Sequence, residues 1–221
     1  MSVSFTLERS PHVLADADRE AILADPGFGR FFTDHMATAC WTAERGWQES
    51  RVAARTPLAV DPATAVLHYG QEIFEGLKAY RHADDSVWLF RPEANDRRFA
   101  RSALPVLDER AFLDSIEQLV CADRGWLPSH GGEVSLYLRP FMFATTPSLA
   151  VGPPAHTTFA VIASPAGPYF ASGVTGIRLW VSTDYTRAAV GGTGAAKCGG
   201  NYAAGLAAQV QAQQHGCDQV L

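Results

Sequence analysis

A lysine surrounded by small residues near the end of the 221-residue chain is the feature best suited to chemistry. The run over residues 191–202 reads Gly-Gly-Thr-Gly-Ala-Ala-Lys-Cys-Gly-Gly-Asn-Tyr and contains Lys197. Lys78 is the only other lysine, and all the remaining basic residues among the 18 lysines and arginines are arginines. A reaction that needs a lysine side chain therefore has two candidates in this sequence.

Glycine-rich segments before helices often bind phosphate through backbone N–H groups, but the spacing here does not match those motifs. A P-loop has Gly directly before its lysine and Ser or Thr directly after it, whereas Lys197 lies between Ala196 and Cys198. The third glycine of the dinucleotide-binding fingerprint is also missing. The spacing therefore disfavours a nucleotide-binding loop.

Imine formation is the other chemistry that suits Lys197, because a flat carbonyl cofactor must approach the amine closely and small neighbours leave that room. Burial would lower the pKa of this lysine from its reference value of about 10.4 and make the amine a better nucleophile. Tyr202 can hydrogen-bond a phenolic oxygen of such a cofactor. A solvated loop lysine fits the same residues, so both interpretations stay open here.

Two further groups of side chains can bind anions. A helix predicted over residues 93–103 carries Arg97, Arg98 and Arg101 on more than one face, so at least one guanidinium can point inward toward a phosphate. A strand predicted over residues 133–140 places Tyr137 and Arg139 on one face, where they can bind a carboxylate. The solvent-exposed polar face of an edge strand explains that pair equally well.

The elements that position these residues follow from the apolar pattern and from Gly and Pro. Asp108 predicts the N-cap of a helix with a core-facing apolar stripe. Residues 67–76 predict one or two helical turns closed by Gly76, and Asn201 is predicted to cap a helix that runs through Gln214. The other predicted elements are a helix over 16–24, a hairpin over 77–81 and 87–91 that makes Lys78 a strand residue, and strands over 35–43, 157–163 and 176–182.

The chain is expected to divide into two parts at its segment richest in Pro, Gly and Ser. We predict a small N-terminal domain over residues 1–163, a linker over 164–175 and the beginning of a larger domain over 176–221. A domain of fewer than about 50 residues is below the usual size, so we expect the sequence to be incomplete. A loop over 145–154 is expected to expose Leu149 and Val151.

The composition limits the classes of function. A hydrophobic content of 47% is ample for a core, and a net charge of −5 argues against a nucleic-acid or anionic-membrane partner. No leader-like or membrane-spanning run is evident, which predicts a cytoplasmic protein. The four cysteines and seven histidines lack metal-ligand spacing, so we expect reduced thiols and no metal.

The run over 191–202 closely resembles the lysine motif of branched-chain amino acid aminotransferases, fold-type IV enzymes that use pyridoxal 5′-phosphate. Other segments resemble the family in the same order, among them Phe-Glu-Gly-Leu-Lys-Ala over 74–79 and Tyr-Leu-Arg-Pro over 137–140. These two runs belong to the longer matching segments 67–80 and 135–140, and the other matching segments are 28–36, 89–95, 146–149 and 164–170. The resemblance covers nearly the whole chain from Phe28 and implies an α+β / α/β fold of type IV.

The resemblance also implies roles for individual residues. Lys197 resembles the lysine that forms the internal aldimine and carries the proton between substrate and cofactor, Arg98 the phosphate-binding arginine, and Tyr202 the tyrosine at the phenolic oxygen. Leu149 and Val151 resemble a loop that enters the neighbouring subunit's pocket, which implies a homodimer. The residues implied around the substrate side chain are Phe28, Tyr69, Phe74, Tyr137, Arg139 and Tyr169.

The family's partner for the pyridine nitrogen and its further phosphate-binding turns are expected beyond Leu221, so we expect the chain alone to lack full activity. The resemblance implies amino acids and 2-oxo acids as substrates. D-amino acid aminotransferase and aminodeoxychorismate lyase share the lysine and the cofactor, and a non-catalytic dimerising fragment is the alternative outside enzymes. The segments over 74–79 and 137–140 favour the branched-chain group.

Overall fold

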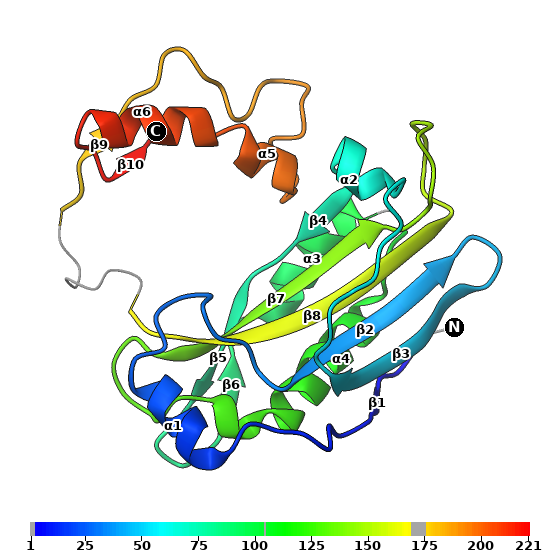
Figure 1. Ribbon diagram of the computed structural model, residues 1–221, viewed down its shortest axis with the longest axis vertical. Coiled ribbons are helices and arrows are strands. Elements are labelled where there is room, and N and C mark those ends of the chain that lie inside the picture. Colours follow the sequence, from blue (N-terminus) through cyan, green and yellow to red (C-terminus); the bar gives the residue numbers. More distant parts are fainter. Residues whose placement is uncertain (1–2, 104, 169–175) are drawn as a thin grey trace.

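A computed structural model describes residues 3–103, 105–168 and 176–221 (Figure 1). The first two ranges contain one eight-stranded sheet of β1 Thr6–Leu7, β2 His35–Thr42, β3 Gly46–Ala54, β4 Glu72–Phe74, β5 Leu77–Arg81, β6 Val87–Leu89, β7 Ser135–Ala144 and β8 His156–Ala166. Its order is β1–β3–β2–β8–β7–β5–β6, and β4 pairs with β7 off this path. Apart from the parallel pair β1–β3, the pairs in this sheet are antiparallel.

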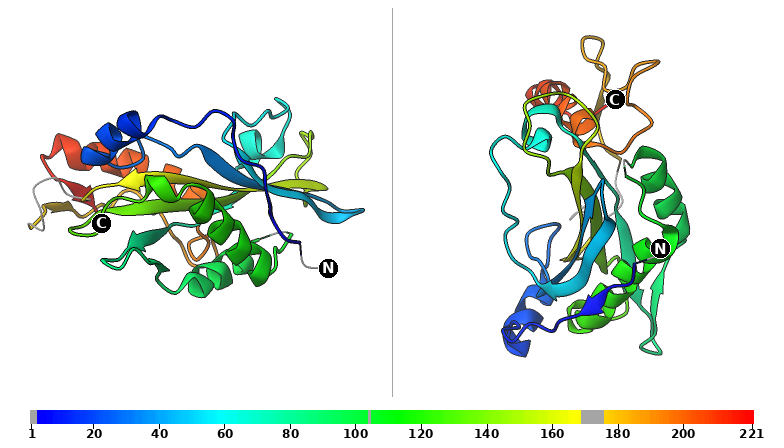
Figure 2. Two further views of the ribbon diagram at one scale, coloured as in Figure 1. Left: turned by 90° about the horizontal axis from the view of Figure 1, so that it is seen from below. Right: turned by 90° about the vertical axis from the view of Figure 1, so that its right-hand side faces the viewer.

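Helices α3 and α4 cover one face of this sheet (Figure 2). The helices of this part are α1 Asp16–Ala24, α2 Ala65–Tyr69, α3 Pro92–Ser102 and α4 Glu109–Ala122, followed by a short 3-10 turn over Arg124–Trp126. The predicted cap of α4 is confirmed, because the Asp108 carboxylate accepts a hydrogen bond of 3.0 Å from the backbone N–H of Ala111. The cap satisfies one of the N–H groups that have no partner inside a helix.

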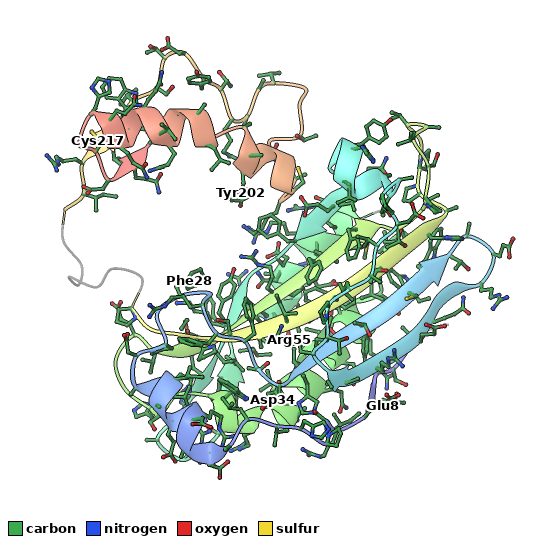
Figure 3. The ribbon with its side chains drawn as sticks, in the orientation of Figure 1. Glu8, Phe28, Asp34, Arg55, Tyr202 and Cys217 are labelled. Atoms are coloured by element: carbon green, nitrogen blue, oxygen red, sulfur yellow. The ribbon has the colours of Figure 1, made fainter. Side chains whose placement is uncertain are left out.

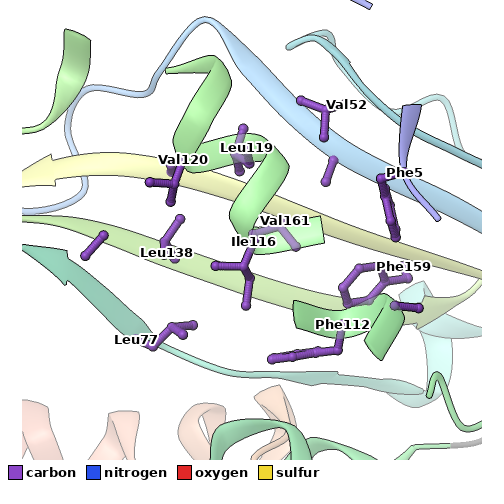
Figure 4. Close-up of a cluster of buried hydrophobic side chains, with 14 of the residues drawn as sticks. Phe5, Val52, Leu77, Phe112, Ile116, Leu119, Val120, Leu138, Phe159 and Val161 are labelled. Carbon is purple, nitrogen blue, oxygen red and sulfur yellow. The ribbon is translucent and has the colours of Figure 1, made fainter. Parts of the chain in front are cut away.

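The core lies between α4 and the sheet (Figure 4). Phe112, Ile116 and Leu119 are fully buried on α4, as the apolar stripe predicts. On β7, Leu138 is likewise fully buried, while its neighbours Tyr137 and Arg139 are only half-buried. Since side chains alternate along a strand, the core and the Tyr137–Arg139 pair lie on opposite faces of the sheet.

Two carboxylates tie the N-terminal segment to this core. Asp34 accepts hydrogen bonds from the backbone N–H of Leu14 at 2.9 Å and from the indole N–H of Trp126 at 2.7 Å. The buried Asp123 lies 2.6 Å from Nδ1 of His35, whose Nε2 accepts from the backbone N–H of Ser10 at 2.8 Å. The loop that carries Phe28 therefore leads from α1 into a segment fixed by several hydrogen bonds.

Residues 176–221 form α5 Gly199–Ala203, α6 Leu206–Gln214 and a parallel pair of β9 Leu179–Trp180 with β10 Gln219–Val220. Figure 1 shows α5 beside β4 and α2, and a hydrogen bond of 2.9 Å from the Phe74 N–H to the Lys197 carbonyl joins the two parts. The expected strand over 176–182 is thus confirmed only at Leu179–Trp180.

The helix predicted over residues 67–76 is confirmed only at residues 67–69, which belong to α2, and is wrong after Gly70. Gly70 adopts a left-handed conformation with φ of 58° and ends α2, and the chain then extends so that β4 pairs with β7.

The predicted division of the chain at 163/164 stays a prediction. Strand β8 continues to Ala166, and residues 169–175, which include Tyr169, lie outside the described residues.

Within the described residues, no helix is long and apolar enough to cross a membrane. All four cysteines carry free thiols. No group of three or more His, Cys, Asp or Glu side chains in the described ranges is arranged to hold a metal ion.

Asp96 provides a test of the α3–α4 packing. Its side chain is 4% exposed, its Oδ1 has no hydrogen-bond partner among the described residues, and burial, with the nearby Glu109 charge, raises its pKa to about 6. Because the folded-state pKa lies above the unfolded value, the stability that Asp96 contributes is present at low pH and lost as the pH rises through about 6.

We predict that Asp96→Asn raises the free energy of unfolding by about 1–3 kcal/mol at pH 7.5, and that this gain disappears below about pH 4. Urea unfolding at both pH values measures it. Asp18→Asn, which changes an exposed carboxylate on α1, should show no such pH-dependent gain. An equal effect of Asp96→Asn at pH 4 and pH 7.5 would contradict the prediction.

Candidate functional site

The amine of Lys197 lies between a hydroxyl group and an aromatic ring. Its Nζ is 2.6 Å from the hydroxyl oxygen of Tyr202 and 4.6 Å from the centre of the Phe74 ring. The two rings are themselves 5.0 Å apart. Lys197 is half-buried, so its amine has one hydrogen-bond partner and an attractive ring face while part of the side chain stays accessible.

The strand β4 holds the lysine segment at its outer edge. Phe74 and Glu72 flank Ile73 on this strand and point to the same face, because side chains alternate. The Phe74 N–H points away from β7 and donates to the Lys197 carbonyl at 2.9 Å. An edge strand has unpaired backbone groups of this kind, so the lysine segment satisfies a donor that would otherwise face solvent.

Glu72 provides the second attachment of this segment, because its carboxylate accepts a hydrogen bond from the backbone N–H of Gly199. A Cβ atom at position 199 would overlap that carboxylate, so a larger residue there would displace the Glu72 side chain from this hydrogen bond. Burial raises the pKa of the Glu72 carboxyl, and the Gly199 N–H and the charge of Arg139 oppose the shift. Lys197 and Gly199, on either side of Cys198, are therefore both hydrogen-bonded to β4.

Asn201 shapes the turn that leads into Lys197, and its prediction as a helix cap is wrong. It lies inside α5, is 4% exposed, and donates 2.7 Å hydrogen bonds to the carbonyls of Thr193 and Ala196. Its amide oxygen accepts from the Thr193 hydroxyl at 2.7 Å. The predicted single helix is divided, because α5 ends at Ala203 and α6 begins at Leu206.

Arg98 is the arginine of α3 that lies near the lysine. Its guanidinium donates from Nε and Nη2 to the two carboxylate oxygens of Glu75, at 2.5 and 2.7 Å. This contact raises the pKa of Arg98 further above its ordinary value, and Tyr202 contributes to the same shift to a smaller extent. No described ion pair joins Arg97 or Arg101 to this region, so Arg98 is the one of the three candidate arginines that lies at the site.

Arg139 and Tyr137 lie together beside Phe74, as the alternation along β7 predicts. Arg139 Nη2 donates to the Tyr137 hydroxyl at 3.1 Å, and its guanidinium lies 4.7 Å from the centre of the Phe74 ring. Its Nε is buried and has no partner among the described residues. Phe28, which is labelled in Figure 3, packs edge-on against Tyr137 with the ring centres 5.1 Å apart.

Tyr69, Leu149 and Val151 form a separate group at the loop between β7 and β8. The Tyr69 hydroxyl donates to the Leu149 carbonyl, and Leu149 and Val151 are 66% and 75% exposed as predicted. No described hydrogen bond or ring contact joins this group to Lys197. Val151 does line a cavity of about 370 Å³ together with Glu72, so β4 borders both groups.

Comparison with known proteins decides the family. No protein-family model matches the chain. It is 56% identical over 218 residues to a probable branched-chain-amino-acid aminotransferase of Streptomyces coelicolor, and 52% identical over 223 residues to the branched-chain-amino-acid aminotransferase of Mycolicibacterium smegmatis. These matches cover 97% and 99% of this chain. By sequence, the chain belongs to the branched-chain-amino-acid aminotransferase family.

The chain spans about 60% of the length of these two family members, so the activity of a whole aminotransferase is a proposal for it. A mouse relative named as a cytosolic branched-chain-amino-acid aminotransferase is 46% identical over 88% of this chain and 51% of its own length.

Solved aminotransferases confirm the predicted fold class. An Escherichia coli branched-chain amino acid aminotransferase matches with a TM-score of 0.64 at 26% identity, over 83% of this chain and 59% of that one. The T.th. enzyme with pyridoxamine 5′-phosphate matches with a TM-score of 0.62 at 26% identity, over 84% and 59%. The fold is therefore the α+β fold of type IV aminotransferases.

Sequence reasoning missed the contacts that hold two parts of the site in place. Glu72 and Asn201 hold the lysine segment, and Glu75, supported by Asn95, holds Arg98. The two glutamates were hidden by the helical interpretation of residues 67–76. Gly70 followed by the alternating Glu-Ile-Phe run was the signal that could have revealed a strand. The lysine motif itself gave no signal of the Asn201 contacts, which depend on the turn geometry.

The Asn201 contacts predict that Asn201→Ala loosens the turn before Lys197. Three hydrogen bonds to Thr193 and Ala196 are lost, so amide hydrogen exchange over residues 193–197 should accelerate roughly 10- to 100-fold. Exchange in β7 and β8 provides the internal control and should not change. Unaltered exchange over 193–197 would contradict the role given to this side chain.

Proposed function

We propose that the chain carries the lysine side of the active site of a branched-chain amino acid aminotransferase, which transfers the amino group of leucine, isoleucine or valine to 2-oxoglutarate. The observation that carries the proposal is the meeting of three groups at β4. The Lys197 amine and the Tyr202 hydroxyl are 2.6 Å apart, and Arg98 is paired with Glu75, the residue that follows the Phe74 ring beside the amine.

These groups fit pyridoxal 5′-phosphate. Its aldehyde requires a lysine amine, its phenolic oxygen a hydrogen-bond donor and its phosphate a guanidinium, and Lys197, Tyr202 and Arg98 offer these in turn. The structure of the T.th. relative is described with the related pyridoxamine 5′-phosphate. When bound, the cofactor supplies a reactive carbonyl carbon and an electron-withdrawing ring.

The residues of this chain then hold and move protons around that group. The Lys197 amine would act as a general base toward the proton on the substrate Cα and, once protonated, as a general acid that gives the proton back. Tyr202 orients the amine, because its hydroxyl is the amine's hydrogen-bond partner. The Phe74 ring covers one side of Nζ and limits the access of water.

The substrate side of the proposed site is aromatic with one cation. Phe28, Phe74 and Tyr137 offer apolar surface for a branched side chain, and Arg139 has a buried unpaired Nε beside them for a carboxylate. Tyr69 and Tyr169 are part of the same proposal, although Tyr69 contacts the loop and Tyr169 is outside the described residues.

A homodimer completes the proposal. Leu149 and Val151 are large apolar side chains held at an exposed loop, and a second copy of the chain would cover them by receiving the loop in its own pocket. A cytoplasmic location is included because the mouse relative is named cytosolic.

The two lysines of the chain provide a matched test of the cofactor proposal. Lys197→Arg should abolish the absorbance band of the imine, which is shifted from the near-ultraviolet band of free pyridoxal 5′-phosphate, because a guanidinium does not form the imine. Lys78→Arg keeps a positive charge on β5 and should retain the band. Persistence of the band in Lys197→Arg, or its loss in Lys78→Arg alone, would show that the lysine is wrongly assigned.

A further inference from the structure

We propose that Glu75 is a positioning residue that fixes Arg98 so that the outer edge of the guanidinium faces a phosphate group. The inference rests on the proposed function, in which Arg98 binds the phosphate of the cofactor. Glu75 itself would not touch the cofactor. Its side chain is 0% exposed, whereas the side chain of Arg98 is 44% exposed, so the carboxylate holds the arginine from the protein side.

The Glu75 carboxylate is itself fixed from several directions. Asn95 donates to Oε2 at 2.8 Å, and the backbone N–H of Gly76 donates to the same oxygen at 3.2 Å. The backbone N–H of Glu75 donates to the Pro140 carbonyl at 2.7 Å, which attaches the residue to β7. The carboxylate therefore has little freedom to follow a moving arginine.

Arg98 is expected to stay on Glu75 when a phosphate binds. A fully buried carboxylate is strongly disfavoured without a counter-charge, and Arg98 is the cation that forms an ion pair with it in the described residues. Withdrawing the arginine would leave that charge unpaired in the protein interior. The Glu75–Arg98 contact therefore belongs to the binding-competent arrangement.

The geometry leaves donors for an anion. A guanidinium carries five N–H donors in one plane, and Glu75 takes one from Nε and one from Nη2. The Nη1 group bonds to no other described residue. Because the fork is planar and rigid, fixing its inner edge also fixes the direction of its outer edge, and less freedom is lost when a phosphate is bound.

If Glu75 competed with the phosphate instead of positioning Arg98, its substitution would have the opposite effect on phosphate binding. If the carboxylate competed with the phosphate for Arg98, removing its charge would release the arginine and strengthen phosphate binding. The positioning role predicts that removing the charge weakens it. Comparing pyridoxal 5′-phosphate with pyridoxal, which lacks the phosphate, separates an effect at Arg98 from an effect at Lys197.

The experiment measures the dissociation constants of both aldehydes by absorbance titration for the unsubstituted chain, Glu75→Gln and Glu75→Asp. We expect Glu75→Gln to weaken pyridoxal 5′-phosphate roughly 10- to 100-fold, and pyridoxal by less than about twofold. Glu75→Asp keeps the charge on a shorter side chain and should lose less. Asp96→Asn removes another buried carboxylate from the same helix as Arg98 and should leave both constants unchanged.

Thermal unfolding of each variant is recorded alongside, and Glu75→Asp carries the test if Glu75→Gln does not fold. Equal weakening of both aldehydes would show a purely structural role and overturn the inference. Unchanged or tighter binding of pyridoxal 5′-phosphate would overturn it as well. Absence of any absorbance change with the unsubstituted chain would instead overturn the proposed function, and the inference with it.

Discussion

The hydrogen bond between the Phe74 N–H and the Lys197 carbonyl is the contact on which the site depends. It joins a segment near the end of the chain to the edge of a strand only three residues long. β4 has a fixed place because it pairs with β7, whose other face packs against the core under α4. The position of the lysine is therefore set by the same sheet that stabilises the fold, through one short strand and its free edge.

Phe74, the last residue of β4, and Glu75, the residue after it, make contacts on opposite sides of the chain. Phe74 faces Lys197 and Tyr202, whereas Glu75 faces α3 and holds Arg98. The alternation of an extended chain thus places an aromatic ring that faces Lys197 beside a buried carboxylate without any further element. At Gly76 a Cβ atom would overlap the Tyr137 hydroxyl, so the absence of a side chain lets the backbone approach Tyr137 closely. Each residue of the run Phe74-Glu75-Gly76 therefore has its own physical role.

Local patterns in the sequence predicted those parts of the site that depend on local structure. Helical spacing and a capping carboxylate located α4, and strand alternation placed Tyr137 beside Arg139. The helix expected over residues 67–76 was wrong after Gly70 because this left-handed glycine ends it early, and the gain from pairing with β7 outweighs the local pattern. Contacts such as Glu72 with Gly199 and Asn201 with Thr193 depend on distant or turn-specific geometry, which residue types and spacing do not encode.

Reductive trapping tests most directly whether this strand presents Lys197 to a pyridoxal cofactor. The chain is incubated with pyridoxal 5′-phosphate, reduced with borohydride, digested and analysed by mass spectrometry. We predict a phosphopyridoxyl group on the peptide that contains Lys197 and none on the peptide that contains Lys78. A label on Lys78 or on the N-terminal amine, with Lys197 unmodified, would contradict the assignment of the site.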